Sequence, residues 1–258
     1  MFIKSKKLLS VSADAKTSKG NKKGVLTGIL YLAPHTISGH QVCPKASPGC
    51  RAACLYTAGR GVYNSVQNAR INKTKWFFGE RDSFMEKLVA DIAALVKKAK
   101  KLNMEPAVRL NGTSDIAWEK IACKRDGKVY RNVMEAFSDV QFYDYSKVIG
   151  RKSALALPNY HLTFSLSEEN DADAIKALSE GYNVAVVLNI GKNEPKPATW
   201  GGYPVIDGDE TDIRFRDPKG GHIVALSAKG DARKMGLGFV RDKNGGFKDK
   251  IIPISVAA

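Results

Sequence analysis

The feature that most constrains the fold is a series of short apolar segments that end in polar residues and are separated by longer stretches. Seven of these segments read as strands: residues 25–33, 107–110, 140–143, 161–166, 184–189, 204–206 and 223–226. Short, continuously apolar strands are typical of sheets that are covered on both faces. Strands that alternate with helices predict parallel βαβ units with right-handed crossovers, and therefore an α/β protein.

The clearest helix pattern covers residues 83–102, where Phe84, Leu88 and Ile92 belong to an apolar stripe at helical spacing. Three further helices are expected over residues 63–78, 116–122 and 172–180. Gly181 follows the last of these and is a suitable C-cap. The intervals between the strands are therefore long enough for the crossovers of a parallel sheet.

The number of strand and helix units favours one barrel-like domain. Six or seven such units in roughly 230 residues fit a complete or partial (β/α) barrel with predominantly parallel strands better than a doubly wound sheet. We expect this domain to cover residues 25–258. Residues 1–24 are polar and rich in lysine, and we expect them to form an extended, basic lead-in segment.

The charge balance indicates an anionic partner. Among 258 residues, 41 Lys and Arg oppose 26 Asp and Glu, which gives a formal net charge of +15. Such an excess favours polyanions, so nucleic acid, with DNA ahead of RNA, is the expected partner; the alternative is that the charge only maintains solubility. The longest apolar run, residues 25–33, is too short to cross a membrane, and we expect a protein of the host cytoplasm.

Three cysteines lie within twelve residues, in the loop after the first expected strand. Cys43, Cys50 and Cys54 have the spacing C-x6-C-x3-C, with Pro and Gly between them. Because cytosolic thiols stay reduced, this cluster predicts a metal site rather than disulfides. Zinc needs a fourth ligand, for which His40 is near in sequence and His35 and Cys123 are remoter candidates. A four-iron cluster on three cysteines instead leaves one iron open. The alternative is three ordinary buried thiols.

Polar residues stand where the expected strands end, and parallel strands bring these ends together. Four aspartates there are candidate acids, bases, nucleophiles or metal ligands: Asp115, Asp144, Asp207 and Asp209. Four further residues are candidates for positioning a cofactor: Asn111, Ser114, Ser165 and Glu168. Two alternatives stay open, because Asp115 is also placed to cap a helix and Asp-Gly pairs also form simple turns.

The segment after the cysteine loop combines cations with aromatic residues, as sites for single-stranded nucleic acid do. Four of its residues are candidate nucleic-acid contacts: Arg60, Arg70, Lys73 and Lys75. The helical spacing of Trp76 and Phe77 predicts that these aromatic side chains face the core. The absence of Walker, G-x-G-x-x-G, H-E-x-x-H and G-x-S-x-G motifs argues against phosphotransferases, nicotinamide enzymes, zinc proteases and serine hydrolases of the common kinds.

The cysteine motif, followed by Gly59-Arg60 and a basic helix, resembles a family of uncharacterised bacteriophage proteins. The resemblance continues through four further segments, at residues 109–115, 142–145, 161–168 and 205–212. It covers most of residues 25–240. It implies a phage setting without implying an activity.

More distantly, a three-cysteine loop after the first strand of a partial barrel is similar to the radical S-adenosylmethionine enzymes. Their spacing is C-x3-C-x2-C; here Cys50 and Cys54 match the first interval, Thr57 stands where the next cysteine would be, and Cys43 supplies the third thiol from upstream. The resemblance implies a [4Fe–4S] cluster on these cysteines with S-adenosylmethionine at the open iron.

Three hypotheses follow. The first is a phage enzyme that modifies nucleic acid at a base, with the cysteine-held centre supplying radical chemistry. The second keeps the enzyme but makes the metal a structural zinc, with Asp144 or Asp207 performing base exchange or transglycosylation on DNA. The third is a non-catalytic nucleic-acid-binding protein whose zinc loop is purely structural.

Overall fold

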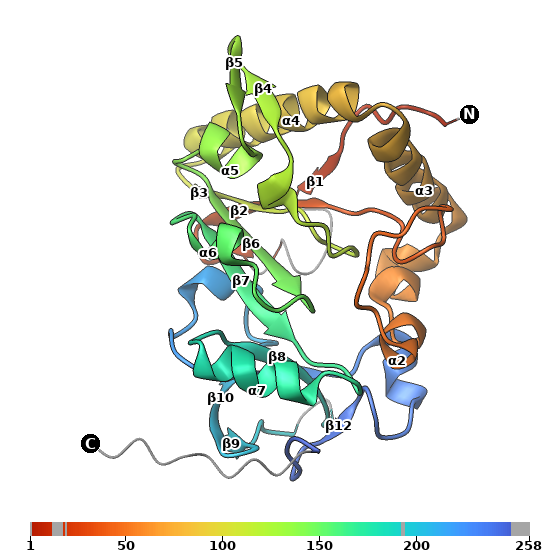
Figure 1. Cartoon of the computed structure of the whole chain (residues 1–258), viewed down its shortest axis with the longest axis vertical. Helices are drawn as coiled ribbons and strands as arrows, with labels where there is room; N and C mark the ends of the chain where they lie inside the picture. Colours follow the sequence, from red (N-terminus) through yellow and green to blue (C-terminus); the bar gives the residue numbers. More distant parts are fainter. Residues whose placement is uncertain (1, 12–17, 19, 192–193, 249–258) are drawn as a thin grey trace.

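The computed structural model describes residues 2–11, 18, 20–191 and 194–248. Its centre is a ten-stranded sheet in the order β1-β2-β3-β6-β7-β8-β11-β10-β9, with β12 pairing beside β8 (Figure 1). The strands are β1 Leu9–Val11, β2 Val25–Leu30, β3 Glu105–Arg109, β6 Gln141–Ser146, β7 Tyr160–Ser165, β8 Val184–Asn189, β9 Thr199–Trp200, β10 Tyr203–Asp207, β11 Ile223–Ser227 and β12 Arg241–Asp242. Strands β4 Cys123–Arg125 and β5 Lys128–Tyr130 form a separate hairpin.

The sheet is mostly parallel, as the alternation of strands and helices predicts. Strands β2, β3, β6, β7 and β8 are successive parallel neighbours, and β11 and β10 continue the parallel arrangement in reversed order. All seven strands expected from the sequence are present. The additional strands β1, β9 and β12 contain two or three residues each.

A complete barrel is not confirmed, because the strands in the described part of the chain form an open sheet. Direct pairing of β2 with the last strand of the series would close the parallel strands. However, one edge of β2 is taken by antiparallel β1 and the other by β3, while antiparallel β9 ends the opposite side. From β2 to β8, the strands of this sheet lie side by side in the order in which they occur in the chain, as they do in a (β/α) barrel.

The helices are α2 Pro48–Ala52, α3 Asn64–Gly79, α4 Arg81–Lys101, α5 Val133–Ala136, α6 Lys152–Leu155 and α7 Asp171–Ser179. Short 3-10 turns are η1 Leu55–Thr57, η2 Gly59–Val62, η3 Trp118–Lys120, η4 Arg214–Arg216 and η5 Gly230–Lys234. The helix expected over residues 116–122 is reduced to η3. The Ile116 amide just before this turn donates to Asn111 Oδ1.

The two faces of the sheet are covered differently. Leu26, Val108 and Phe142 belong to the main core together with the apolar face of α4, as their alternation along the strands requires. On the opposite face, Ala107 and Tyr143 pack against residues of the segment after β10. The helices thus lie against one face while irregular chain covers the other, which leaves the carboxyl ends of the strands to carry loops.

Residues 2–11 of the lead-in segment lie against the rest of the fold. Strand β1 pairs with β2, and Leu8 and Leu9 are buried. Its backbone is bound by α3 and α4, because the Lys73 ammonium donates to the Leu8 carbonyl (2.8 Å) and the Leu8 amide donates to Asp91.

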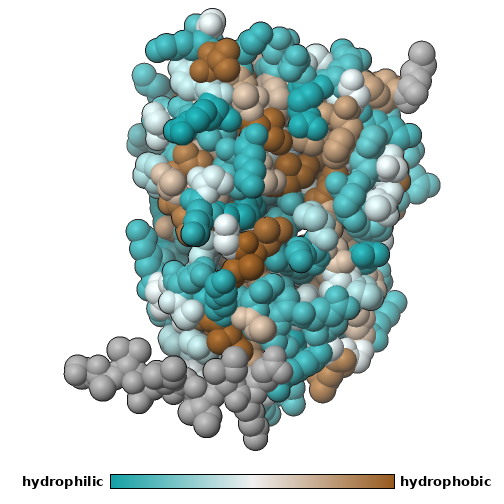
Figure 2. All heavy atoms as spheres, in the orientation of Figure 1, coloured by the Kyte–Doolittle hydropathy of each residue, from teal (hydrophilic) through white to brown (hydrophobic). Residues whose placement is uncertain are grey.

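Hydrophilic residues cover most of the face in Figure 2, and apolar residues are exposed in small groups between them. Among the described residues, no helix is both long enough and apolar enough to cross a membrane.

Candidate functional site

The carboxyl ends of β2, β3, β6 and β7 bring the cysteine loop together with several of the predicted polar residues. Because these four strands are parallel neighbours, the loops that follow them lie at one edge of the sheet. The contacts among these loops define the candidate site.

Cys43 joins the loop after β2 to the loop after β3. Its Sγ accepts the His35 amide (3.3 Å) and donates to the Thr113 carbonyl (3.8 Å). The pKa of the Cys43 thiol is raised to about 12, mainly by burial and also by the nearby Cys54, Asp115 and Cys50, while the His35 amide acts in the opposite direction. Burial also raises the pKa of Cys54, with Cys50 adding to the effect. The three thiols therefore share one electrostatic neighbourhood.

The thiols do not form a finished coordination sphere. Within the part of the chain that the structure describes, no group of three or more His, Cys, Asp or Glu side chains is arranged to hold a metal ion. The proposed fourth ligand, His40, has its ring stacked on Phe78, with centroids 4.3 Å apart. Cys123 lies on β4 in the main core. Neither contact brings a fourth ligand to the three cysteines.

Glu168, after β7, holds the cysteine loop in place. Its carboxylate accepts the Gly49 amide (2.6 Å) and the Ser47 hydroxyl (2.8 Å). The Ser47 hydroxyl in turn caps α2 by accepting the Cys50 amide. A Cβ at Gly49 would lie 2.6 Å from the carboxylate, so a larger residue there would displace the Glu168 side chain. Although burial acts against ionisation, these hydrogen bonds lower the pKa of Glu168 below its ordinary value.

Two cations lie close to the thiol of Cys54. Arg70 and Lys147 both act to lower its pKa, against the larger effect of burial. The Lys147 ammonium donates to the Ser165 hydroxyl (2.7 Å) at the end of β7. Ser165 thus helps to position a cation at the site. Cations at this position favour thiolates, which are the form that binds metals.

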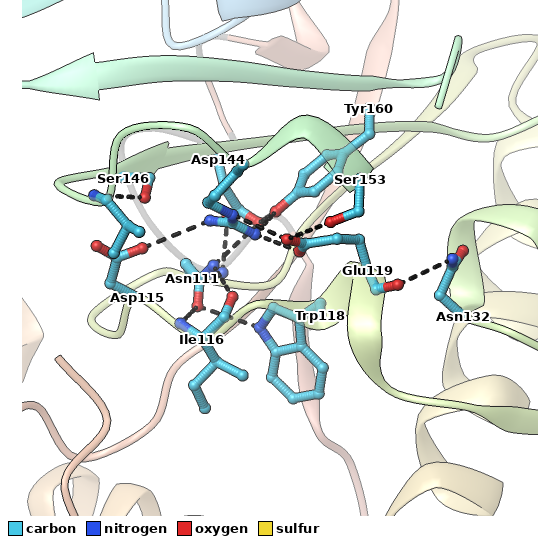
Figure 3. Close-up of polar contacts among 12 residues, drawn as sticks. Asn111, Asp115, Ile116, Trp118, Glu119, Asn132, Asp144, Ser146, Ser153 and Tyr160 are labelled. Atoms are coloured by element: carbon cyan, nitrogen blue, oxygen red, sulfur yellow. Dashed lines mark hydrogen bonds and ion pairs between the residues drawn. The ribbon is translucent and has the colours of Figure 1, made fainter. Parts of the chain in front are cut away.

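Asp144 is the centre of a buried network rather than an exposed catalytic group (Figure 3). It accepts the Asn111 amide (2.7 Å) and the Tyr160 hydroxyl (3.0 Å). Burial raises the pKa of Asp144 to about 7, and the charge of Arg109 and these donors act in the opposite direction. With 1% of its surface exposed, Asp144 contacts its neighbours and not solvent.

Asn111 organises the loop after β3 by the same network. Its Oδ1 accepts the Ser114 hydroxyl (2.8 Å), the Ile116 amide (2.9 Å) and the Trp118 indole N–H (3.1 Å) (Figure 3). Asn111 and Ser114 are both buried. These hydrogen bonds stabilise the loop. They use most of the hydrogen-bonding groups of Asn111 and Ser114, so few are left to bind a cofactor.

Asp115 connects two loops of the site. Its carboxylate accepts the Lys147 amide (2.8 Å) and lies 3.5 Å from the guanidinium of Arg151. Arg151 also forms a buried ion pair with Glu119. The sequence alternative of a helix cap is not what Asp115 does, because the following segment does not form an α-helix.

Asp207 and Asp209 lie at the end of β10, which β11 and β8 separate from β7. Asp209 pairs with Lys229 (2.6 Å) and Lys196 (3.0 Å). Although burial acts to raise it, these lysines and the Ser227 amide hold the pKa of Asp209 well below its ordinary value. Asp209 is therefore the centre of an ion-pair cluster with these two lysines.

Two of the predicted nucleic-acid contacts are buried. Arg70 stands over the rings of Tyr31 (4.8 Å) and Tyr56 (5.5 Å), and Lys73 binds the Leu8 carbonyl. Their burial corrects the expectation that they face a nucleic acid. Arg60 is exposed and Lys75 half-buried.

From the sequence, Lys147 belongs to the polar residues that follow the expected strands, but it is not among the selected site candidates. Its position directly after a strand was a usable signal, but its proximity to Cys54 depends on how the loops pack.

Together these features define a class: an open, largely parallel α/β protein with a cysteine-bearing loop fastened at the carboxyl ends of its strands. The chain belongs to the gene product 88 family, whose model matches residues 6–243. The match is consistent with the phage family that its motifs resemble. No curated protein and no solved structure matches the chain.

Proposed function

We propose that this protein is a nucleic-acid-modifying enzyme in which Cys43, Cys50 and Cys54 hold a metal centre at the carboxyl edge of the sheet. One observation carries the proposal. Three thiols from a single loop share an electrostatic neighbourhood at the edge where parallel α/β proteins carry their chemistry. The net charge of +15 supports an anionic substrate.

The donor set fits an iron–sulfur cluster better than structural zinc. Tetrahedral zinc requires a fourth protein ligand. The ring of His40, the candidate nearest in sequence, is stacked on Phe78, and His35 contacts Cys43 through its backbone amide. Three cysteines suffice for a [4Fe–4S] cluster with one open iron, which would bind S-adenosylmethionine and supply radical chemistry. Ligation requires the thiols to approach one another more closely than they do in this structure.

The surrounding residues have defined roles in this proposal. Glu168 fixes the loop that carries Cys50, and Cys43 is held against the loop after β3. Arg70 and Lys147 favour the ionised thiol of Cys54, which ligation needs. Asp144 keeps the loop after β3 in position through Asn111 and does not touch the substrate.

The geometry gives less support to aspartate-based base exchange with a structural zinc. Asp144 is buried within its network, and Asp209 is neutralised by two lysines. Asp207 is exposed, but its Oδ1 accepts the Asp209 amide in a local turn (2.8 Å).

The test is the metal and sulfide content and the absorbance spectrum of protein purified without oxygen. A brown protein with about four irons per chain and a thiolate-to-iron band supports the proposal. Cys50→Ser should abolish the colour, while Cys123→Ser, the matched control in the core, should retain it. A colourless protein with one zinc per chain would exclude the iron–sulfur centre.

A further inference from the structure

A group of exposed cations surrounds the cysteine loop and has no role in holding the metal centre. Lys45, Arg51 and Arg60 belong to the chain segment around the cysteines, and Arg233 and Lys234 belong to η5 near the C-terminal end of the described chain. All five side chains are exposed. The question is whether these two segments make one surface.

Three contacts join the two segments. The Thr57 hydroxyl donates to the Asp231 carboxylate (2.9 Å). Ala53 and Ala232 belong to one buried apolar cluster, and a Cβ at Gly230 would lie 3.1 Å from the Cβ of Ala58. Figure 1 shows α2 beside the C-terminal segment, in agreement with these contacts. The segment that follows the cysteines and η5 therefore pack against each other, which brings their cations to the same region of the protein.

Arg51 and Arg233 are anchored in the same way. The Arg51 Nε–H donates to the Ala46 carbonyl and the Arg233 Nε–H donates to the Ala228 carbonyl, each at 3.1 Å. Among the described residues, neither guanidinium forms an ion pair with a carboxylate. A backbone carbonyl thus restricts the position of each arginine side chain, and no carboxylate of the described residues neutralises its charge.

An anchored, exposed guanidinium is suited to a phosphate, because its terminal amino groups match phosphate oxygens in a planar, bidentate geometry. We infer that Arg51 and Arg233 form a clamp for the phosphodiester backbone of a nucleic acid next to the cysteine loop. This inference rests on the proposed function, because the clamp would bind the nucleic acid that the proposed enzyme modifies.

The test compares the salt dependence of nucleic-acid binding in two double variants. Fluorescence anisotropy of a labelled DNA duplex, and of the same strand alone, measures the dissociation constant over a salt series. Arg51→Gln/Arg233→Gln removes the clamp. Lys124→Gln/Lys128→Gln is the matched control. These two exposed lysines lie on the β4–β5 hairpin, and their substitution removes the same amount of positive charge.

For the clamp variant, we expect the slope of log affinity against log salt to fall by about 1.8 with duplex or about 1.4 with a single strand, as for two lost phosphate contacts. The control should change the slope by less than half as much. Equal slopes for the clamp variant and the wild type, or an equal loss in the control, would overturn the clamp.

The outcomes separate the clamp from the proposed function. If the wild type binds neither DNA form nor a matching RNA strand, both the clamp and the nucleic-acid substrate fail. If the clamp variant loses affinity while the wild type proves to contain no metal, the clamp stands and the metal centre fails. Far-ultraviolet circular dichroism and the thermal midpoint of each variant exclude unfolding as the cause.

Discussion

Removing the carboxylate of Glu168 should loosen the cysteine loop while the rest of the protein stays folded. In Glu168→Ala, the Gly49 amide and the Ser47 hydroxyl lose their acceptor. A hydrogen bond to a charged group contributes about 1.5–3 kcal/mol, and the partial exposure of Glu168 places both bonds at the low end. We expect the local free energy of opening to fall by about 2–3 kcal/mol, which corresponds to an opening population about 30- to 150-fold larger.

Amide hydrogen exchange, resolved by mass spectrometry on the peptide that carries α2, measures this opening. The amides of Arg51 and Ala53, which donate to the Ser47 and Gly49 carbonyls, should exchange faster by that factor. Amides of α4 should be unaffected. The matched control is Glu169→Ala, because the Glu169 side chain is the neighbouring exposed carboxylate. Unchanged exchange in Glu168→Ala, or an equal increase in α4, refutes the reasoning.

Three further predictions concern single positions. Gly49→Ala should open the loop as Glu168→Ala does, since the new Cβ would lie 2.6 Å from the Glu168 carboxylate; retained protection in the same exchange experiment contradicts this. Phe84→Ala should lower the free energy of unfolding by about 3–5 kcal/mol in a urea titration, because Phe84 is fully buried; a loss below about 1 kcal/mol contradicts the packing. Asp144 binds its proton more tightly when folded, since burial raises its pKa from 3.8 to about 7, so its contribution to stability is lost as pH rises between these values. Asp144→Asn should therefore make the slope of unfolding free energy against pH in this window more positive by up to about 1.4 kcal/mol per pH unit, and an unchanged slope contradicts the assignment.

Local patterns in the sequence determine the main elements. Apolar runs such as residues 184–189 form the expected strands because they are buried on both faces. The stripe of Phe84, Leu88 and Ile92 forms the buried side of α4, and Gly181 ends α7 with a positive φ of 84°. Each signal lies within the element that it predicts, so the sequence is sufficient to find it. The cysteine spacing belongs to the same kind of local signal.

Only the tertiary structure decided how these elements combine, because the deciding contacts join residues far apart in the chain. Strand β1 has three residues and exists through its pairing with β2, and it takes the edge of β2 that direct pairing with the last strand would use. Lys73 has the sequence appearance of a surface cation, yet it is buried against the backbone of Leu8. Glu168 reaches the cysteine loop across 119 positions of sequence, and no local pattern encodes that distance. The chemistry-bearing residues are thus visible in the sequence, whereas their partners, charges and accessibility are set by the packing of the loops.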